Sequence, residues 1–255
     1  MTSSSRPAVP VRLRVDLSRP SAVVARELRR AIISGAFDGD GRLPPEAELA
    51  GELGISRHRL REAIRLLEAE GLVRVKPGRN GGIFPSPPTE EALTRSFATV
   101  LGARRTPLSD VFEARLQIES ACAALAAGRA GDDDLAELRS LTSVSVDAYA
   151  ALGDQELNTR FHLAVARAGH NEAFVVIMSA IRSLIAGVDA RVMTPQTRAG
   201  LREGSLRAHR AIVRAIEARD ATKAAERMRM HIAGFWERPE VQALRPGTLT
   251  VNEIL

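Results

Sequence analysis

Cysteine and aromatic residues are scarce in this sequence of 255 residues. There is one cysteine, one tryptophan and one tyrosine, and aromatic residues make up only 4% of the chain. Because Cys122 is the only thiol, no disulfide can form within the chain, and a reducing, cytoplasmic setting is expected. We interpret Cys122 as a small core residue, with a redox sensor as the alternative.

Long hydrophobic runs are also absent from the sequence. The longest apolar stretch, Ala173 to Ala180, is far too short to span a bilayer. The N-terminus carries prolines and arginines but no apolar segment of the kind that a secretory signal needs. The sequence therefore predicts a soluble protein with no membrane partner.

Positive charge is unevenly distributed along the chain. The net charge is +5 and the isoelectric point is about 10.4. Residues 1–88 contain 15 Lys and Arg against 10 Asp and Glu, so this first third carries the whole net charge and the rest is neutral. The length suits two domains, and the asymmetry indicates a nucleic-acid-binding module joined to a neutral sensor or interaction module.

A helix-turn-helix pattern occupies the first part of the segment Leu43–Phe84. In the turn, Gly54 can adopt a positive φ and Ser56 can cap the following helix. One face of that helix is apolar and contains Leu60, Ala63, Ile64 and Leu67. The other face is basic and contains Arg57, Arg61 and Arg65, with His58 and Arg59 beside them. A solvated arginine stripe is the alternative, but the arrangement is typical of a helix that enters the major groove of DNA.

A glycine-rich hairpin is expected directly after this helix. Two apolar runs, Glu70–Val75 and Ile83-Phe84, flank the basic tip Lys76–Gly82. The backbone of such a tip can approach phosphates closely because glycine carries no side chain. The candidate DNA contacts of this wing are Gly78, Arg79 and Asn80. The whole segment predicts a winged helix-turn-helix.

The stretch LPPEAELA…LGISRHRLREAIRLLEAEGLV resembles the DNA-binding domain of the GntR family of bacterial transcription regulators. The resemblance implies that Gly78 lies at the wing tip and that operator DNA is contacted by Arg57, His58, Arg59 and Arg61. The family usually carries arginine after the glutamate of the LPPE-like turn, where this chain has Ala47. One DNA contact typical of the family is therefore expected to be missing.

The remainder of the chain predicts a helical bundle, so the fold is mainly α, with an N-terminal winged helix-turn-helix and a C-terminal antiparallel bundle. We expect a flexible arm over 1–18, the winged helix over 19–85, a linker over 86–89, the helical effector-binding and dimerisation domain over 90–238, and a tail over 239–255. The bundle should contain six or seven helices. Their breaks are expected near Gly102 to Pro107, Gly131 to Asp134, Gly153, Gly169 to Asn171, Met193 to Gly200 and Arg219-Asp220.

Three histidines share faces with apolar residues on separate helices of this bundle: His162, His209 and His231. Asn158 lies one turn before His162, so three imidazoles and one amide point into the interior. Such a set suits zinc, nickel or a similar divalent metal and leaves positions open for a ligand. Hydrogen-bonded core histidines are the alternative.

The bundle also resembles the FCD effector-binding domain of the FadR-like branch of GntR regulators. The residues that carry this resemblance are Glu113, Arg115 and Glu119, then N-x-x-F-H ending at His162, then Asn171, His209 and His231. The resemblance implies a metal ion held by the three histidines and by the residue four before the first, usually aspartate and here Asn158. Arg115 is the candidate for binding an effector carboxylate through two hydrogen bonds, with an internal ion pair to Glu119 as the alternative.

Together these features predict a homodimeric transcription regulator, acting as a repressor on double-stranded operator DNA and controlled by a small organic acid. The family resemblance implies that acid binding in the bundle shifts its helices and changes the spacing of the two winged helices across a palindromic operator. A metal-dependent hydrolase built on the three histidines is the main alternative, and a nonspecific architectural DNA-binding protein is another. A hydrolase does not need a basic winged helix, and an architectural protein does not need inward histidines.

Overall fold

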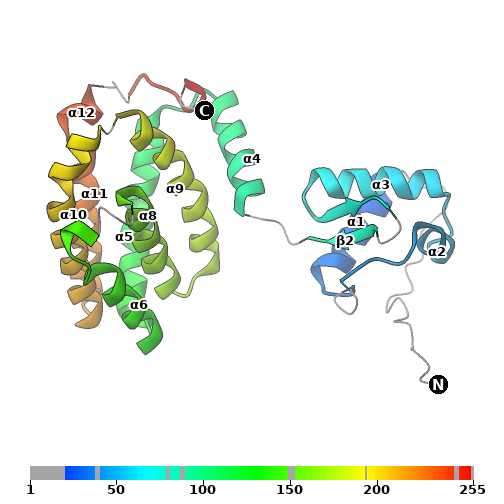
Figure 1. The fold of residues 1–255 in the computed structure, drawn as a ribbon, viewed down its shortest axis with the longest axis horizontal. Helices are drawn as coiled ribbons and strands as arrows, with labels where there is room; N and C mark the ends of the chain where they lie inside the picture. The colour runs from blue at the N-terminus through cyan, green and yellow to red at the C-terminus, as the bar shows by residue number, and fades with distance from the viewer. Residues whose placement is uncertain are drawn as a thin grey trace. The chain divides into compact units, whose positions relative to one another are not determined.

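The chain folds into two compact units, Met1–Ala92 and Leu93–Leu255 (Figure 1). Their structure was obtained as a computed structural model, which describes residues 21–37, 41–78, 81–86, 90–148, 153–192, 194–243 and 247–253. The expected arm over 1–18 lies outside these residues, as does most of the expected linker.

The first unit is a three-helix domain with a hairpin. It contains α1 (Ser21–Ile33), α2 (Glu46–Glu52), α3 (Arg57–Ala69), β1 (Val73–Lys76) and β2 (Gly82–Pro85). Gly54 has a φ of 64° in the turn between α2 and α3, and the Ser56 side chain accepts a hydrogen bond from the Arg59 backbone N–H. The predicted apolar face of α3 is buried against α1 and α2. The winged helix-turn-helix predicted from the sequence is thereby confirmed.

The hairpin pairs β1 with β2 in antiparallel register, with Val73 opposite Pro85 and Lys76 opposite Gly82. Two glycines fix the shape of its tip. Gly78 has a φ of 101°, which disfavours any residue with a side chain. A Cβ atom at Gly81 would lie 2.1 Å from the Lys76 carbonyl oxygen, so no larger residue fits there. The tip residues Arg79 and Asn80 lie outside the part of the chain that the structure describes.

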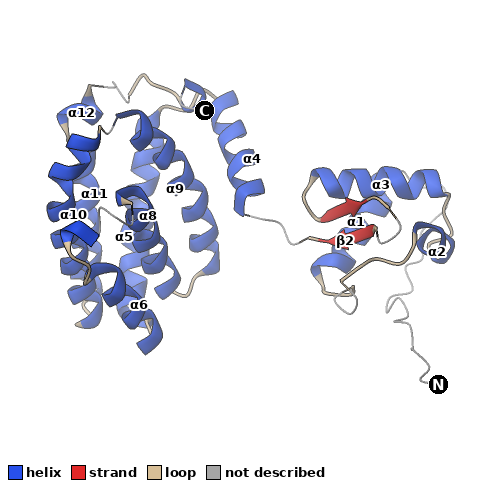
Figure 2. Cartoon of the chain, viewed as in Figure 1, coloured by secondary structure: helices blue, strands red, loops and turns tan. Residues whose placement is uncertain are grey.

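The second unit is helical, and Figure 2 shows the two described strands only in the first unit. Its helices are α4 (Glu90–Ala103), α5 (Leu108–Arg129), α6 (Asp132–Thr142), α8 (Asp154–Ala168), α9 (Glu172–Val192), α10 (Pro195–Glu217) and α11 (Ala221–Trp236). The predicted helical bundle is confirmed. No helix among the described residues is both long and apolar enough to cross a membrane.

Helix α5 lies at the centre of this bundle and contacts α8, α9, α10 and α11. Small residues such as Ala123, Ala126 and Ala127 are fully buried on it, which lets the neighbouring helices approach its backbone closely. Two charged residues, Arg115 and Glu119, are also buried on this helix. A central helix with buried charges requires partners for them on the surrounding helices.

The segment 239–255, expected as a tail, packs onto the bundle where it is described. It contributes α12 (Pro239–Gln242) and a short 3-10 helix η1 (Val251–Glu253). The Leu108 backbone N–H donates to the Leu249 carbonyl at 2.9 Å, and the Val251 N–H donates to the Thr106 carbonyl at 3.0 Å. Val251 is fully buried in the apolar cluster formed with α4, α5 and α9. This segment therefore fixes the start of α5.

Candidate nucleic-acid interface and metal centre

The exposed face of α3 carries the basic residues that the sequence singled out. Arg57, His58 and Arg61 are exposed, and Arg59 is partly buried. The opposite face anchors the helix in the core of the first unit, so the arginines are held on a fixed scaffold. The side-chain cap from Ser56 fixes the first turn, where Arg57 and His58 lie.

Arg61 has a partner that the sequence analysis did not identify. Its Nε donates to Glu46 Oε2 on α2 at 2.7 Å. The pair is largely exposed, so it adds little to stability, but it restricts the direction of the guanidinium. Glu46 lies 15 residues before Arg61, and only the helix-turn-helix packing brings the two together.

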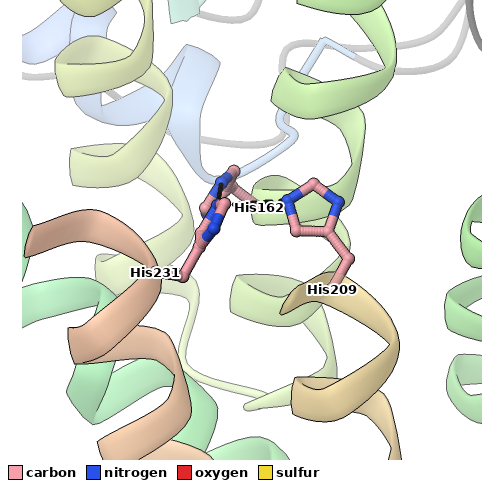
Figure 3. A group of neighbouring side chains, drawn as sticks. All are labelled: His162, His209 and His231. Atoms are coloured by element: carbon pink, nitrogen blue, oxygen red, sulfur yellow. Dashed lines mark hydrogen bonds between the residues drawn. The ribbon is translucent and has the colours of Figure 1, made fainter. Parts of the chain in front are cut away.

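The structure brings His162, His209 and His231 together inside the bundle (Figure 3). They come from α8, α10 and α11, and their candidate ligand atoms all lie within 4.8 Å of one another. The Nε2 atoms of His209 and His231 are 3.1 Å apart, and those of His231 and His162 are 3.3 Å apart. The three edges that carry Nε2 therefore face a common point.

These separations match what a divalent metal requires. Imidazole nitrogens about 2.0–2.1 Å from zinc lie about 3.3 Å apart at a tetrahedral angle and about 2.9 Å apart at a right angle. The two measured separations, 3.1 and 3.3 Å, fall in this range. Asn158 is on the same helix as His162, one turn earlier, and lines a cavity together with His231. The three imidazoles therefore fit a metal ion, with Asn158 near them on the cavity wall.

A buried carboxylate lies behind His162. Glu119 Oε2 contacts His162 Nδ1, which leaves Nε2 free to face the other two histidines. Glu119 Oε1 accepts a hydrogen bond from Arg115 Nε at 2.6 Å. The ion-pair interpretation of Arg115 is therefore confirmed, and Glu119 gains a second contact that the sequence analysis did not identify. His209 is held differently, because its ring stacks on Phe161 with centroids 3.8 Å apart.

The histidines are held in the neutral form that binds metals. Burial lowers the pKa of His162 to about 4, although Glu119 favours its charged form. Burial also lowers the pKa of His209 and of His231 well below the usual value. Burial alone would raise the pKa of Glu119, but His162 and Arg115 hold it well below its usual range. The site therefore contains neutral imidazoles and an ionised carboxylate.

Cys122 lies one turn beyond Glu119 on α5 and is buried. Burial raises the pKa of its thiol to about 12, and the neighbouring Glu119 acts in the same direction. A protonated, buried thiol is a poor nucleophile. The structure therefore supports the core interpretation of Cys122 over a redox sensor.

A cavity of about 250 Å³ adjoins the histidine cluster. Helices α10 and α11 form most of its wall with Leu201, Gly204, Ser205, Ala208, Met230, His231, Gly234 and Phe235, and Arg115, Asn158 and Arg238 complete it. Arg115 thus has two environments, because its Nε faces Glu119 while its side chain also lines the cavity. His231 connects the histidine cluster to this space.

Two residues of the sequence pattern lie apart from the cluster. Glu113 is exposed on α5, and the Asn171 side chain accepts a hydrogen bond from the Phe174 N–H at the start of α9. Arg238 is the charged residue of the cavity wall that sequence reasoning overlooked. It follows His231 by seven residues, which is about two helical turns. Helix α11 ends at Trp236, however, so helical spacing alone does not predict that Arg238 lies beside the cavity.

A winged helix with an exposed basic helix, joined to a helical domain with a ligand-sized cavity, defines a DNA-binding regulator. Known proteins agree with this class. Residues 20–83 match the family "Bacterial regulatory proteins, gntR family", and residues 110–234 match the FCD domain.

Similar proteins place the chain in the same family. A protein of Escherichia coli K12 assigned as the regulatory protein of the L-lactate dehydrogenase operon is 31% identical over 84% of each chain. The galactonate operon transcriptional repressor of the same organism is 30% identical over 83% of this chain and 93% of its own length. The solved structure of Streptococcus agalactiae GntR matches with a TM-score of 0.63 and 28% identity, over 86% of this chain and all of that one. The chain therefore belongs to the GntR family and is a transcription regulator, not an enzyme.

Proposed function

We propose that this regulator is a homodimeric repressor, whose operator binding is controlled by a small organic acid bound beside a divalent metal ion. The observation that carries the proposal is the histidine cluster adjoining a cavity that Arg115 and Asn158 also line. The galactonate operon relative is described as a repressor, and it matches both units of this chain over most of their length. The hydrolase alternative finds no support in these relatives.

In this proposal the first unit binds operator DNA. Helix α3 enters the major groove with Arg57, His58, Arg59 and Arg61, and the wing with Gly78, Arg79 and Asn80 follows the phosphates. A two-fold dimer places two such units on a palindromic site. Acid binding in the helical domain changes their spacing, so that both half-sites can no longer be bound together.

In the helical domain the acid occupies the cavity. The metal would be held by Asn158, His162, His209 and His231. Zinc and nickel are the first metals to test. When bound, the metal supplies a Lewis acid for an oxygen of the acid. Arg115 offers its guanidinium fork to the carboxylate. Because Asn158 is a neutral amide where the family usually has aspartate, the site binds metal more weakly but attracts an anion more strongly.

The location of the acid can be tested by filling the cavity. Gly204 lines the cavity and Gly200 does not, although both lie on α10 and a Cβ at either position meets no atom within 4 Å. Gly204→Leu should therefore fold but lose the thermal shift caused by small carboxylates, and operator DNA should no longer be released by them. Gly200→Leu is the matched control and should behave like the wild type. Unchanged acid binding by Gly204→Leu would place the acid elsewhere.

Metal binding gives a second test. His209→Ala should reduce the metal content from one ion per subunit to a small fraction, measured by elemental analysis. It should also remove the stabilisation by added zinc or nickel, about 2.7 kcal/mol at a metal concentration of 100 times Kd. His170→Ala is the control, because His170 is exposed and contacts Asp134 away from the cluster.

Asn158→Asp should bind metal more tightly. A wild-type protein with no metal and no thermal response would support the core-histidine interpretation instead.

A further inference from the structure

Arg238 is held at the rim of the cavity by its backbone. It is the N-terminal cap residue of α12, and its carbonyl accepts a hydrogen bond from the Gln242 N–H at 2.9 Å. Its own N–H donates to the Phe235 carbonyl at the end of α11, and Pro239 follows it. Both peptide groups of Arg238 are therefore held in place, and its side chain lines the cavity.

The Arg238 guanidinium lacks a complete set of partners. Its Nε is buried and has no hydrogen-bond partner among the described residues. No ion pair of this residue is found in the described part of the chain. A buried guanidinium nitrogen without an acceptor is costly, because water has been removed and nothing has replaced it. Arg238 also lines the cavity, so an anion there can meet its positive charge.

The charges around the cavity favour an anion with more than one acidic group. Arg115 and Arg238 both line it, whereas no Asp or Glu of the described part of the chain is among its lining residues. Glu119 offsets the charge of Arg115 from behind, and Arg238 has no such neighbour in the cavity wall. A single carboxylate bound at Arg115 would therefore leave the second guanidinium without a counter-charge.

We propose that Arg238 forms a second anion subsite, so that the cavity selects acids with two anionic groups over acids with one. This inference rests on the proposed function, in which the first carboxylate binds at Arg115. A cavity of about 250 Å³ has room for a hydroxy diacid of four or five carbons. The match to the FCD family ends at residue 234, before Arg238, so this subsite belongs to the chain's own C-terminal segment.

The test uses pairs of acids that differ only at the far end. L-malate is compared with 2-hydroxybutyrate, and 2-hydroxyglutarate with 2-hydroxyvalerate, by calorimetry on the full-length protein with and without one equivalent of zinc. The wild type should bind the diacid of at least one pair about tenfold more tightly or better, because a charge-assisted hydrogen bond is gained. Arg238→Gln should reduce this ratio to near one while leaving the affinity for the monoacid unchanged.

Two further variants separate charge from shape. Arg238→Lys keeps the positive charge and should retain part of the preference. Arg207→Gln removes an exposed arginine of α10 that pairs with Glu203, and it should leave the ratio as in the wild type. Equal binding of both acids by the wild type, or a ratio that survives Arg238→Gln, would overturn the second subsite while the proposed function stands. If no acid of either pair binds, the acid-controlled function fails and the subsite fails with it.

Discussion

Methionine in place of Arg115 should lower the free energy of unfolding of the helical domain by about 3–5 kcal/mol. The side chains of Arg115 and Glu119 are only 3% and 2% exposed, so removal of the guanidinium leaves a buried carboxylate without its cation. His162 can offset only part of this loss, because burial keeps it neutral. Urea unfolding followed by circular dichroism measures the change, and in a domain of this size each kcal/mol corresponds to about 2–4 °C in Tm.

The double variant Arg115→Met with Glu119→Gln is the control. With both charges removed, it should be more stable than Arg115→Met alone, and the double-mutant cycle should give a clear coupling energy. Arg115→Lys separates the two roles of this residue. Lysine restores part of the stability by its charge, but it cannot make the two parallel hydrogen bonds to an acid. Wild-type stability of Arg115→Met would mean that the ion pair contributes nothing, and full acid response of Arg115→Lys would remove Arg115 from the acid site.

The inward direction of the histidines could be predicted from the sequence because each shares a helical face with apolar residues. Val165 lies one turn after His162, Ile212 one turn after His209 and Met228 one turn before His231, and all three apolar residues are buried. Spacing within one helix fixes the face on which a side chain lies. It does not say which faces of different helices meet, so the 3.1 and 3.3 Å separations needed the folded chain.

The contacts that the sequence did not reveal all cross between elements. Glu46 reaches Arg61 from another helix, and Glu119 on α5 reaches His162 on α8. Docking of the C-terminal segment onto the start of α5 rests on two backbone hydrogen bonds and the buried Val251. Almost any sequence can make backbone hydrogen bonds, so no residue pattern in the sequence could predict this docking.

Most breaks between helices were predicted at glycine or proline, and two helix ends differ from this expectation. The break expected over Met193 to Gly200 is much shorter, because α10 begins at Pro195 with Thr194 as its cap and Gly200 lies inside the helix. Proline suits the first position of a helix, where its missing N–H has no intrahelical partner in any case. Helix α6 ends at Thr142, followed by serines rather than glycine or proline, and this end was not predicted.

Alanine in place of Arg57 is expected to weaken operator binding by about thirtyfold or more. An arginine paired with a guanine contributes about 1–3 kcal/mol, and the proposed dimer loses this contact in both half-sites. The fold should be unaffected, because Arg57 is exposed and the cap on α3 comes from Ser56. Fluorescence anisotropy with an operator selected from genomic fragments measures the affinity.

The control for this experiment removes the same charge from another face of the same unit. Arg26 is exposed on α1 and is more than half accessible beside Glu27, so Arg26→Ala should change operator affinity by much less than Arg57→Ala. Both variants should keep wild-type affinity for metal and acids, because the proposed sites for these ligands lie in the other unit. Affinity of the wild type should fall steeply with salt, since bound phosphates release their counterions. If Arg57→Ala and Arg61→Ala bind the operator as tightly as the wild type, helix α3 is not the recognition helix. The wing would then have to provide the sequence specificity for the operator.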